Sequence, residues 1–296
     1  MITDTIASKH LGKKSELAQN YNPTLLVAVP REENRRIYNI NSSNLPFDGY
    51  DIWHCYEFSA LTKNGLPFTR LLKLKYDCKS DYIIESKSLK LYLNSFNMTR
   101  FELSVEDSLS VCKSLIEKDL SEKLKTDVCV NFIDDNSNKK IILDNYTELT
   151  EIADTDSVNI EEFKENPSLL ICTDADLKEY RLKFSSLRSN CRVTHQPDFA
   201  DVFIYYKSNL HIDELSLIKY LVSFRSEYHF HEECVDMIYK RLSDILNIND
   251  ELAVCALYTR RGGIDINPLR ISKNCKINDF AFLSDIKVFS RCGVKQ

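Results

Sequence analysis

Glycine is scarce in this chain, with six residues among 296. They cannot be assembled into the G-x-G-x-x-G turn of a dinucleotide-binding strand–helix unit, or into the G-x-x-x-x-G-K-S/T loop around a nucleotide phosphate. Both motifs need glycine because the backbone must come close to the phosphate groups. The sequence therefore argues against a Rossmann site and a P-loop, so a nucleotide cofactor would have to be held in another way.

Long apolar runs are also missing. No stretch approaches the ~20 apolar residues that a helix needs to cross a bilayer. Residues 1–20 are polar and lack the apolar segment of a secretory signal. We therefore expect a cytosolic protein with no membrane contact.

Neither sign of charge is strongly in excess. The chain has 39 Lys and Arg against 44 Asp and Glu, a formal net charge of −5, and no basic cluster. Proteins that bind nucleic acid usually carry a basic patch or stripe. A polynucleotide is therefore a poor candidate for the main ligand, and we expect no direct nucleic-acid binding.

Cysteine is plentiful, at ten residues, but no C-x-x-C pair is present. A zinc ribbon or a thioredoxin motif is therefore disfavoured. Cys55, Cys112, Cys129 and Cys255 fall in apolar stretches, where reduced cysteine behaves as a small hydrophobic side chain. These positions argue against a disulfide framework.

The most informative feature that is present is a segment that occurs twice. Residues 88–96 read Ser-Leu-Lys-Leu-Tyr-Leu-Asn-Ser-Phe, and residues 216–224 read Ser-Leu-Ile-Lys-Tyr-Leu-Val-Ser-Phe, with six of nine positions identical. A match of this length can arise by chance, so it needs support from the order of the predicted elements. If the repeat is genuine, the chain is a duplicated module.

The first half predicts strands and helices in a definite order. Residues 52–61 and 67–76 are apolar and aromatic runs around Asn64-Gly65, a strong hairpin signal because both residues tolerate positive φ. A helix is expected from Ser104, with its apolar stripe at helical spacing. Residues 127–133 and 140–143 then predict a second hairpin.

The second half predicts the same order after an acidic connector at residues 147–167. Strands are expected at residues 179–186, 202–206 and 251–258, and helices at residues 213–224 and 231–246. Each half thus has a strand pair, helical segments and returning strand structure, which indicates an α+β architecture with helices on one face of an antiparallel sheet. The expected divisions are an extension (1–20), an N-terminal module (21–150), a connector (151–167) and a C-terminal module (168–296).

Cys191 is the one cysteine in a polar stretch between two predicted strands. Arg188, Arg192 and His195 are near it in sequence and could favour the thiolate, while Asp198 could supply or accept a proton. The plainer interpretation is a cysteine in a surface turn, and the residue pattern alone leaves both open.

Phe230-His231-Glu232 opens the predicted helix at residues 231–246. The helix dipole alone favours carboxylates such as Glu232 in a first turn. A carboxylate can also accept two parallel N–H bonds, which suits an amino-pyrimidinone edge such as that of guanine. A metal set of His229, His231, Glu232 and Cys234 is a further possibility, but its spacing fits no common zinc pattern.

Two further stretches have the residue types of a phosphate contact. Residues 85–88, Glu-Ser-Lys-Ser, join a strand to the first copy of the repeat, and residues 260–263, Arg-Arg-Gly-Gly, follow a predicted strand. Lysine, arginine and hydroxyl groups bind phosphate oxygens well. A solvated loop and a plain turn are the alternatives.

Taken together, these residues closely resemble one family, the NADPH-dependent 7-cyano-7-deazaguanine reductases, which are the nitrile reductases of queuosine biosynthesis. The resemblance is to their long, two-module form and extends over nearly the whole chain from about Tyr21. The matching stretches are residues 45–49, 85–101, 189–198, 220–225, 230–232 and 258–268.

The resemblance implies a tunnelling fold (T-fold) in two tandem modules, each an antiparallel sheet with helices on one face, and a homodimer. It also implies four-electron reduction of a nitrile to an aminomethyl group by two molecules of NADPH, with no metal. Cys191 would attack the nitrile carbon to form a covalent thioimide, and Asp198 would protonate the nitrile nitrogen.

The resemblance assigns binding roles as well. The residues expected to contact the deazaguanine substrate are Ile84, Glu85, Ser86, Phe230, His231 and Glu232. Those expected to hold NADPH are Ser86, Lys87, Arg261 and Gly262. The chain departs from the family pattern at Phe199 and Leu269, where tryptophan is expected, and both apolar replacements affect packing rather than chemistry.

Two other classes stay open on the sequence. One is a zinc-dependent T-fold enzyme related to GTP cyclohydrolase, and the other is a non-catalytic deazapurine-binding protein. The nitrile reductase makes a spatial prediction that can be checked directly. Glu85 and Cys191, over a hundred residues apart in the chain, should face one pocket between the modules.

Overall fold

The computed structural model describes residues 20–133, 143–156 and 158–289. Its first half contains β1 (Ala28–Pro30), α2 (Glu32–Ile37), β2 (Asp48–Leu61), β3 (Pro67–Asp77), β4 (Tyr82–Ile84), α3 (Ser86–Asn94), α4 (Val105–Leu124) and β5 (Val128–Ile133). Its second half contains β6 (Thr147–Glu148), α5 (Leu149–Ile152), β7 (Cys172–Cys191), β8 (Pro197–Ile212), α6 (Glu214–Val222), β9 (Tyr228–His229), α7 (His231–Ile245), β10 (Glu251–Tyr258), β11 (Ile264–Ile271) and α8 (Ala281–Ser284).

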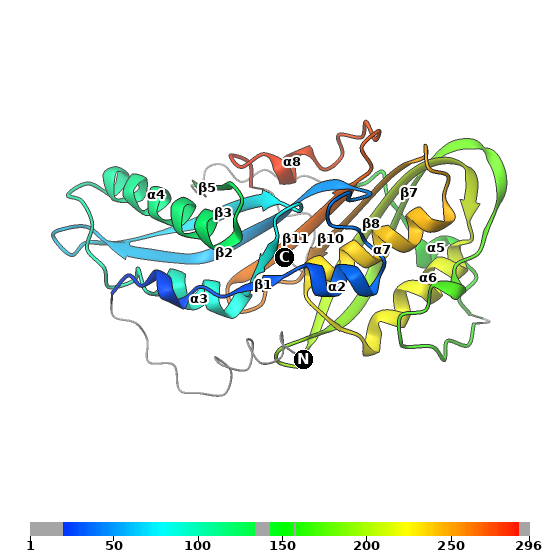
Figure 1. The fold of residues 1–296 in the computed structure, drawn as a ribbon, viewed down its shortest axis with the longest axis horizontal. Helices are drawn as coiled ribbons and strands as arrows, with labels where there is room; N and C mark the ends of the chain where they lie inside the picture. Colours follow the sequence, from blue (N-terminus) through cyan, green and yellow to red (C-terminus); the bar gives the residue numbers. More distant parts are fainter. Residues whose placement is uncertain (1–19, 134–142, 157, 290–296) are drawn as a thin grey trace.

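One long sheet runs through both halves, in the order β5-β3-β2-β11-β10-β8-β7-β6 (Figure 1). Its pairings are antiparallel except for two short parallel ones that β7 makes with β6 and β9. The halves join where the last described strand, β11, pairs with the first long one, β2, from Ile264 opposite Cys55 to Ile271 opposite Asp48. The expected antiparallel α+β architecture is therefore confirmed.

The long helices share one face of this sheet. Helices α3 and α4 pack with β2, β3 and β5 around Trp53 and Tyr92, while α6 and α7 pack with β7, β8 and β10 around Tyr220 and Val254. The opposite face has a smaller core in which Ile52 and Leu269 meet Leu283 of α8. No helix within the described ranges is both long enough and apolar enough to span a bilayer.

The repeated segment forms equivalent structures in the two halves. Glu85 and Asp213 cap the N-termini of α3 and α6 through their carboxylates. Ser88 donates to the Glu85 carbonyl, and Ser216 donates to the Asp213 carbonyl, both at 2.7 Å. A second matching pair lies upstream of these helices. Residues 22–26 and 166–170 each form a short 3-10 turn after an asparagine cap. The repeat is thus a repeat of hydrogen bonding as well as of sequence.

Several predicted boundaries were wrong. Strand β7 runs from Cys172 to Cys191, well beyond residues 179–186, and the connector contains β6 and α5. Cys129 is exposed on the edge strand β5 rather than buried. The predicted strand at residues 140–143 lies outside the described residues except for Leu143, which is in no strand.

Strand β11 was not predicted, although it joins the two halves. Its alternate residues Asp265 and Asn267 are polar yet buried, and Pro268 stands inside it. Proline is uncommon within a central strand because it cannot donate to the ladder, and buried polar residues hide the usual alternation. The sequence pattern therefore gave no strand signal at residues 264–271, where the two halves of the sheet join.

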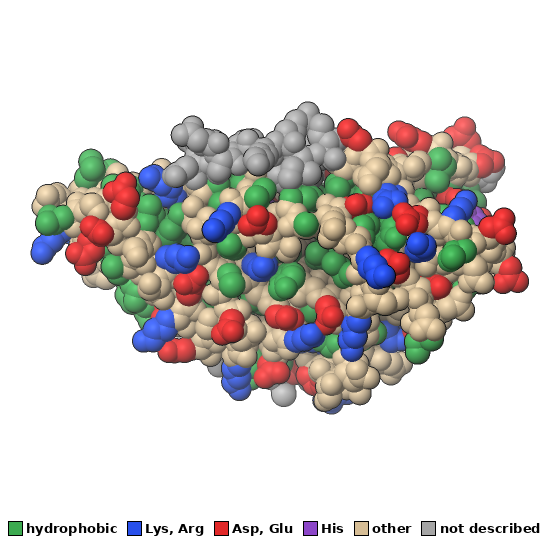
Figure 2. All heavy atoms as spheres, turned by 90° about the horizontal axis from the view of Figure 1, so that it is seen from above, with side chains coloured by type: hydrophobic (Ala, Val, Ile, Leu, Met, Phe, Trp, Pro, Cys, Tyr) green, Lys and Arg blue, Asp and Glu red, His purple; other side chains and the backbone are tan. Residues whose placement is uncertain are grey.

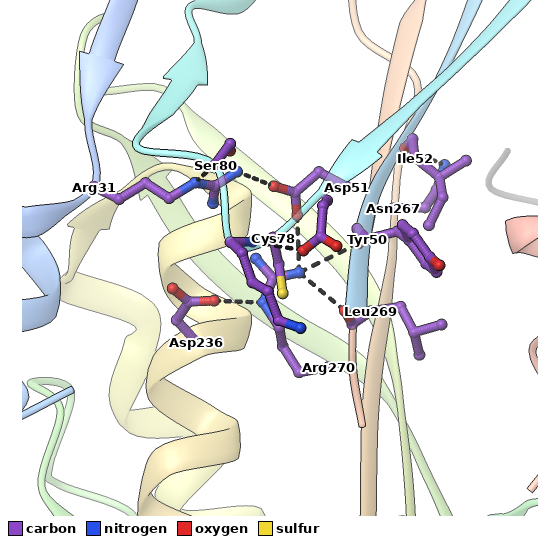
Figure 3. A network of polar contacts seen from close by, with 12 residues as sticks. Arg31, Tyr50, Asp51, Ile52, Cys78, Ser80, Asp236, Asn267, Leu269 and Arg270 are labelled. Carbon is purple, nitrogen blue, oxygen red and sulfur yellow. Dashed lines mark hydrogen bonds and ion pairs between the residues drawn. The ribbon is translucent and has the colours of Figure 1, made fainter. Parts of the chain in front are cut away.

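A network of buried ion pairs lies at the junction of the halves, on the helix-bearing face of the sheet (Figure 3). Asp51 of β2 pairs with Arg31, which follows β1, and with Arg270 of β11. Arg270 also pairs with Asp236 of α7, which in turn accepts a bond from Arg35 of α2. All five side chains are at most 3% exposed, so each charge depends on its partners rather than on water.

Replacing Asp236 with alanine should lower the free energy of unfolding by about 3–5 kcal/mol, because two buried guanidinium groups then lose a partner. Urea denaturation measures this loss. The matched control is Asp244→Ala on the same helix, whose partially exposed carboxylate pairs with Lys240 near the surface and should contribute at most about 0.5 kcal/mol. Equal effects of the two variants would contradict a structural role for the network.

Candidate active site

A cavity of about 260 Å³ opens between the two halves of the chain. Its walls come from β2, the start of α3, the β7–β8 turn, the start of α7, and the β10–β11 turn. The lining residues are Trp53, Ile84, Ser86, Lys87, Lys90, Cys191, Thr194, Gln196, Asp198, His229, Phe230, His231, Glu232, Thr259, Arg261, Gly262, Ile264 and Ile266. Residues from both halves of the sequence therefore share one pocket.

Cys191 ends β7 and begins a tight turn into β8. The Cys191 amide donates to the Gln196 carbonyl at 2.8 Å, and the Cys191 carbonyl accepts from the His195 amide at 2.9 Å. His195 has φ of 56°, in the left-handed region that closes the turn. The Thr194 amide points at the Cys191 Sγ atom from 3.4 Å, so the turn places a backbone donor where it would stabilise a thiolate.

Asp198 lies beside this thiol because β7 and β8 pair Ser189 with Asp198 at the end of the hairpin. Its carboxylate is 6% exposed. One oxygen accepts from Arg261 at 2.7 Å, and the other lies 3.3 Å from Nε2 of His231. The His231 ring stacks on Tyr258 with a centroid distance of 3.7 Å and an interplanar angle of 2°. A carboxyl group, an imidazole and a guanidinium thus form one polar cluster on the cavity wall.

The start of α7 is held by a second charged cluster. Glu233 accepts the Phe230 amide at 3.0 Å and a bond from Arg192 at 3.1 Å, which ties the Cys191 turn to the helix. His229 lies between Glu227 at 3.1 Å and Glu233 at 3.5 Å. Burial alone lowers the pKa of His229, but its bonds to the two carboxylates raise it to about 8.

Glu232 is the carboxylate that this arrangement directs into the cavity. It is 1% exposed, and its Oε1 atom has no hydrogen-bond partner among the described residues. Burial and the nearby charge of Asp51 raise the pKa of Glu232 to about 8. A buried acceptor without a partner costs free energy unless a ligand satisfies it. Glu232 is therefore suited to a ligand that brings N–H donors.

Cationic and hydroxyl groups also line the cavity. Ser86 and Lys87 begin α3, and their hydroxyl and ammonium groups can bind phosphate oxygens. Arg261 and Gly262 lie in the β10–β11 turn, and Lys90 bridges the two elements by donating to the Gly262 carbonyl. Gly262 has φ of 61°, which favours glycine. These groups fit the phosphates of a dinucleotide.

Glu85 does not line the cavity, although both of its neighbours in sequence do. Its carboxylate accepts from the amides of Lys87 at 3.0 Å and Ser88 at 2.6 Å, and it is 6% exposed. The side chain thus caps α3 in this structure. A pocket shared by the two halves is present, but Glu85 contributes to it by placing Ile84 and Ser86 rather than by pointing into it.

The suggested metal set does not converge on one point. His229 is engaged by Glu227 and Glu233, and Cys234 is buried in the core of the second half. Burial raises the pKa of the Cys234 thiol to about 12, which disfavours the thiolate that binds zinc. In the part of the chain that the structure describes, no group of three or more His, Cys, Asp or Glu residues is arranged to hold a metal ion.

Sequence reasoning missed several cavity residues. Trp53 lies in a predicted strand, Lys90 in the repeated segment and Thr259 just after a predicted strand, and their surroundings gave no reason to single them out. Thr194 and Gln196 stand in the polar stretch around Cys191. Neither departure from the family pattern lines the cavity. Phe199 is 43% exposed, and Leu269 is buried on the opposite face of the sheet.

Comparison with known proteins agrees with this geometry. A family model described as the N-terminal part of nitrile reductase, 7-cyano-7-deazaguanine reductase, matches residues 17–132, and one described as QueF-like protein matches residues 197–276. Curated relatives named NADPH-dependent 7-cyano-7-deazaguanine reductase include one from Colwellia psychrerythraea, which is 40% identical over 88% of this chain and 91% of the relative. Another, from Buchnera aphidicola, is 38% identical over 86% of this chain and 94% of the relative. One from Coxiella burnetii is 39% identical over 88% of this chain and 90% of the relative.

The antiparallel α+β fold, with a thiol and a buried carboxyl group beside a cationic pocket, has the parts of an enzyme site that can combine covalent and acid–base chemistry. The particular family follows from the matches along the chain. The protein belongs to the NADPH-dependent 7-cyano-7-deazaguanine reductases, the nitrile reductase family.

Replacing Glu232 with glutamine should stabilise the ligand-free protein, and more so at high pH. A carboxyl group whose pKa is raised from about 4.5 to about 8 lowers stability as the pH rises through that interval, because the folded state resists ionisation. Glutamine does not ionise. The melting temperature of Glu232→Gln relative to the parent should therefore rise between about pH 5 and about pH 9. A difference in melting temperature that stays constant across that pH range would contradict a raised pKa of Glu232.

Proposed function

We propose that this protein reduces the nitrile of 7-cyano-7-deazaguanine to the aminomethyl group of 7-aminomethyl-7-deazaguanine, using two molecules of NADPH, as a step of queuosine biosynthesis. The relatives' names support the substrate and the cofactor. The observation that carries the proposal is that Cys191, Asp198 and Glu232 line one cavity together with the cationic residues Lys87, Lys90 and Arg261.

The substrate would bind with its amino-pyrimidinone edge at Glu232. An ionised Glu232 accepts N–H bonds from that edge, and its unpartnered Oε1 atom supports this role. Phe230 and His231 would flank the ring from the start of α7, with Ile84 and Ser86 on the facing wall. Glu85 would position Ile84 and Ser86 against the ring, since its own carboxylate caps α3.

Cys191 would add through sulfur to the nitrile carbon, and a proton from Asp198 would reach the nitrile nitrogen, giving a thioimide. Ser86, Lys87, Arg261 and Gly262 would hold NADPH, which would supply a hydride in each of two reductions. After the first, the carbon–sulfur bond breaks, and the released imine is the acceptor for the second. His231 and Arg261 hold Asp198 in place for these proton transfers. Enclosure between the halves would keep water from the imine.

The same proposal includes the wider organisation of the molecule. The matching hydrogen bonds around α3 and α6 support two tandem T-fold modules, divided near residues 151–167. The described sheet is open, with β5 at one edge, and an unpaired edge favours association with another chain, here a second copy in a homodimer. Acidic and basic side chains are interspersed on the face shown in Figure 2, in line with a cytoplasmic enzyme whose ligands are small molecules.

Mixing the protein with 7-cyano-7-deazaguanine in the absence of NADPH should give a covalent adduct on Cys191, since addition of the thiol precedes reduction. Intact-protein and peptide mass spectrometry would show a gain equal to the whole substrate, because thiol addition loses no atoms. Cys191→Ala should abolish the adduct and NADPH oxidation, whereas Cys172→Ala, at a cysteine outside the cavity, should retain both. Turnover by an enzyme that forms no adduct would overturn the covalent mechanism.

Lys87→Ala should raise the KM for NADPH roughly tenfold to a hundredfold, because one charge-assisted hydrogen bond to a phosphate is worth about 1.5–3 kcal/mol. Adduct formation without NADPH should change little. Steady-state kinetics with each substrate varied in turn separates the two effects. The control is Lys118→Ala on the exposed face of α4, away from the cavity, which should leave both KM values unchanged. An unchanged KM for NADPH in Lys87→Ala would contradict this cofactor site.

A further inference from the structure

We propose that Arg31 and Asp51, a buried ion pair from the first half of the chain, are positioning residues that set the charge of Glu232 and thereby the affinity for the substrate. The inference rests on the proposed role of Glu232 as acceptor for the substrate's N–H edge. Neither Arg31 nor Asp51 lines the cavity, so both would act through Glu232.

The ion pair is firmly built. Arg31 donates through Nε to the Ser80 hydroxyl at 3.2 Å, and one of its terminal nitrogens pairs with Asp51. The second oxygen of Asp51 accepts from Arg270 at 2.9 Å (Figure 3). Arg31 is 2% exposed and Asp51 is fully buried. Water therefore does not reach this ion pair, and each charge is paired with protein groups.

Glu232 lies one helical turn before Asp236 on α7, and Asp236 pairs with Arg270, which pairs with Asp51. Several buried polar atoms have no hydrogen-bond partner among the described residues, and they include Nη1 of Arg31, Nη2 of Arg270 and Oε1 of Glu232. Unsatisfied buried groups are rare in folded proteins and often mark a functional site. Here two unsatisfied donors carry positive charge, and the unsatisfied acceptor is the carboxyl group that faces the ligand.

The charge balance of the network depends on Glu232. Arg31, Arg35 and Arg270 carry three positive charges against the two negative charges of Asp51 and Asp236. An ionised Glu232 would neutralise the remainder, which favours the carboxylate because an uncompensated buried charge is costly. Burial and Asp51 act in the opposite sense. Opposing influences therefore act on the Glu232 carboxyl group, so a change in the charge of Arg31 or Asp51 should alter its ionisation.

The groups that act on Glu232 come from four other elements. Arg31 beside β1 and Arg270 of β11 favour the carboxylate, whereas Asp51 of β2 opposes it. Tyr76 of β3 also faces it, but burial raises the pKa of Tyr76 far enough to keep the phenol neutral. On the helix of Glu232 itself, the ionisable neighbours are His231, Glu233 and Asp236, and just before it lies His229.

The charge of Glu232 matters because only the carboxylate can accept two N–H bonds without offering a proton of its own. The neutral acid carries a donor that would face a substrate donor. Affinity should therefore fall about tenfold for each pH unit below the pKa of Glu232. The pH at which affinity is half-maximal is the midpoint of this dependence. Removing the charge of Arg31 should move the midpoint upward, and removing the charge of Asp51 should move it downward. If the pair had only a structural role, both substitutions would move the midpoint in the same direction.

The experiment measures noncovalent binding of 7-cyano-7-deazaguanine by calorimetry in a Cys191→Ala background, which prevents adduct formation, as the pH is varied. The parent should show a midpoint near 8. Arg31→Met should raise the midpoint by about one pH unit or more, Asp51→Asn should lower it by a similar amount, and the charge-retaining Arg31→Lys should stay near the parent. Midpoints that move together, or do not move, overturn the inference.

Glu232→Gln in the same background separates this inference from the proposed function. If Glu232→Gln binds as tightly as the parent, the role of Glu232 in substrate binding fails. If its binding is weak and independent of pH while the midpoints of Arg31→Met and Asp51→Asn stay at the parent value, only the inference fails. Should Arg31→Met not fold, Asp51→Asn decides alone, since it keeps the shape of the side chain and a lowered midpoint is predicted only for a charge effect.

Discussion

The pairing of β2 with β11 is the constraint on which the rest of this molecule depends. It joins residues 48–55 to residues 264–271 and so makes one sheet of two halves that are otherwise built from nearby segments of chain. Because side chains alternate along each strand, Asp51, Trp53, Ile266 and Arg270 all fall on the helix-bearing face. The floor of the cavity and the ion-pair network are consequences of this one register, and a shift by one residue would send both to the opposite face.

The junction is held by charge where most sheet interiors are held by apolar contact. Burying five charged side chains is costly, and well-packed apolar residues can be as stable, so stability alone is a weak reason for such a network. Its position offers a stronger reason. It meets α7 at Asp236, one helical turn after Glu232 of the cavity wall, and it spans β2, β11, α2 and α7. We infer that the charges that fix the junction also act on the ligand site.

Local patterns predicted much of the fold and of the site. The Asn64-Gly65 hairpin, the helix beginning at Ser104 and helix α7 at residues 231–245 are short-range features, and each has the expected form. Cys191 and Asp198 lie close together because a hairpin turn joins them, so their proximity could be anticipated from the chain. The resemblance to the nitrile reductases added roles that spacing could not supply. It also placed Glu85 in the pocket, whereas its carboxylate caps α3 because the first turn of a helix offers nearer donors.

The amino-acid sequence by itself determined most of the long elements, the repeat and the residue types that carry the chemistry, because propensity, capping and turn formation act over a few residues. Only the tertiary structure decided which distant groups meet. Strand β11 was hidden by its buried Asp265 and Asn267, and nothing near Arg31 or Asp51 in sequence indicates that they join a buried network with Asp236 of α7. The burial of a side chain and the charges around it depend on how the two halves pack together, and a pattern of neighbouring residues does not predict that packing.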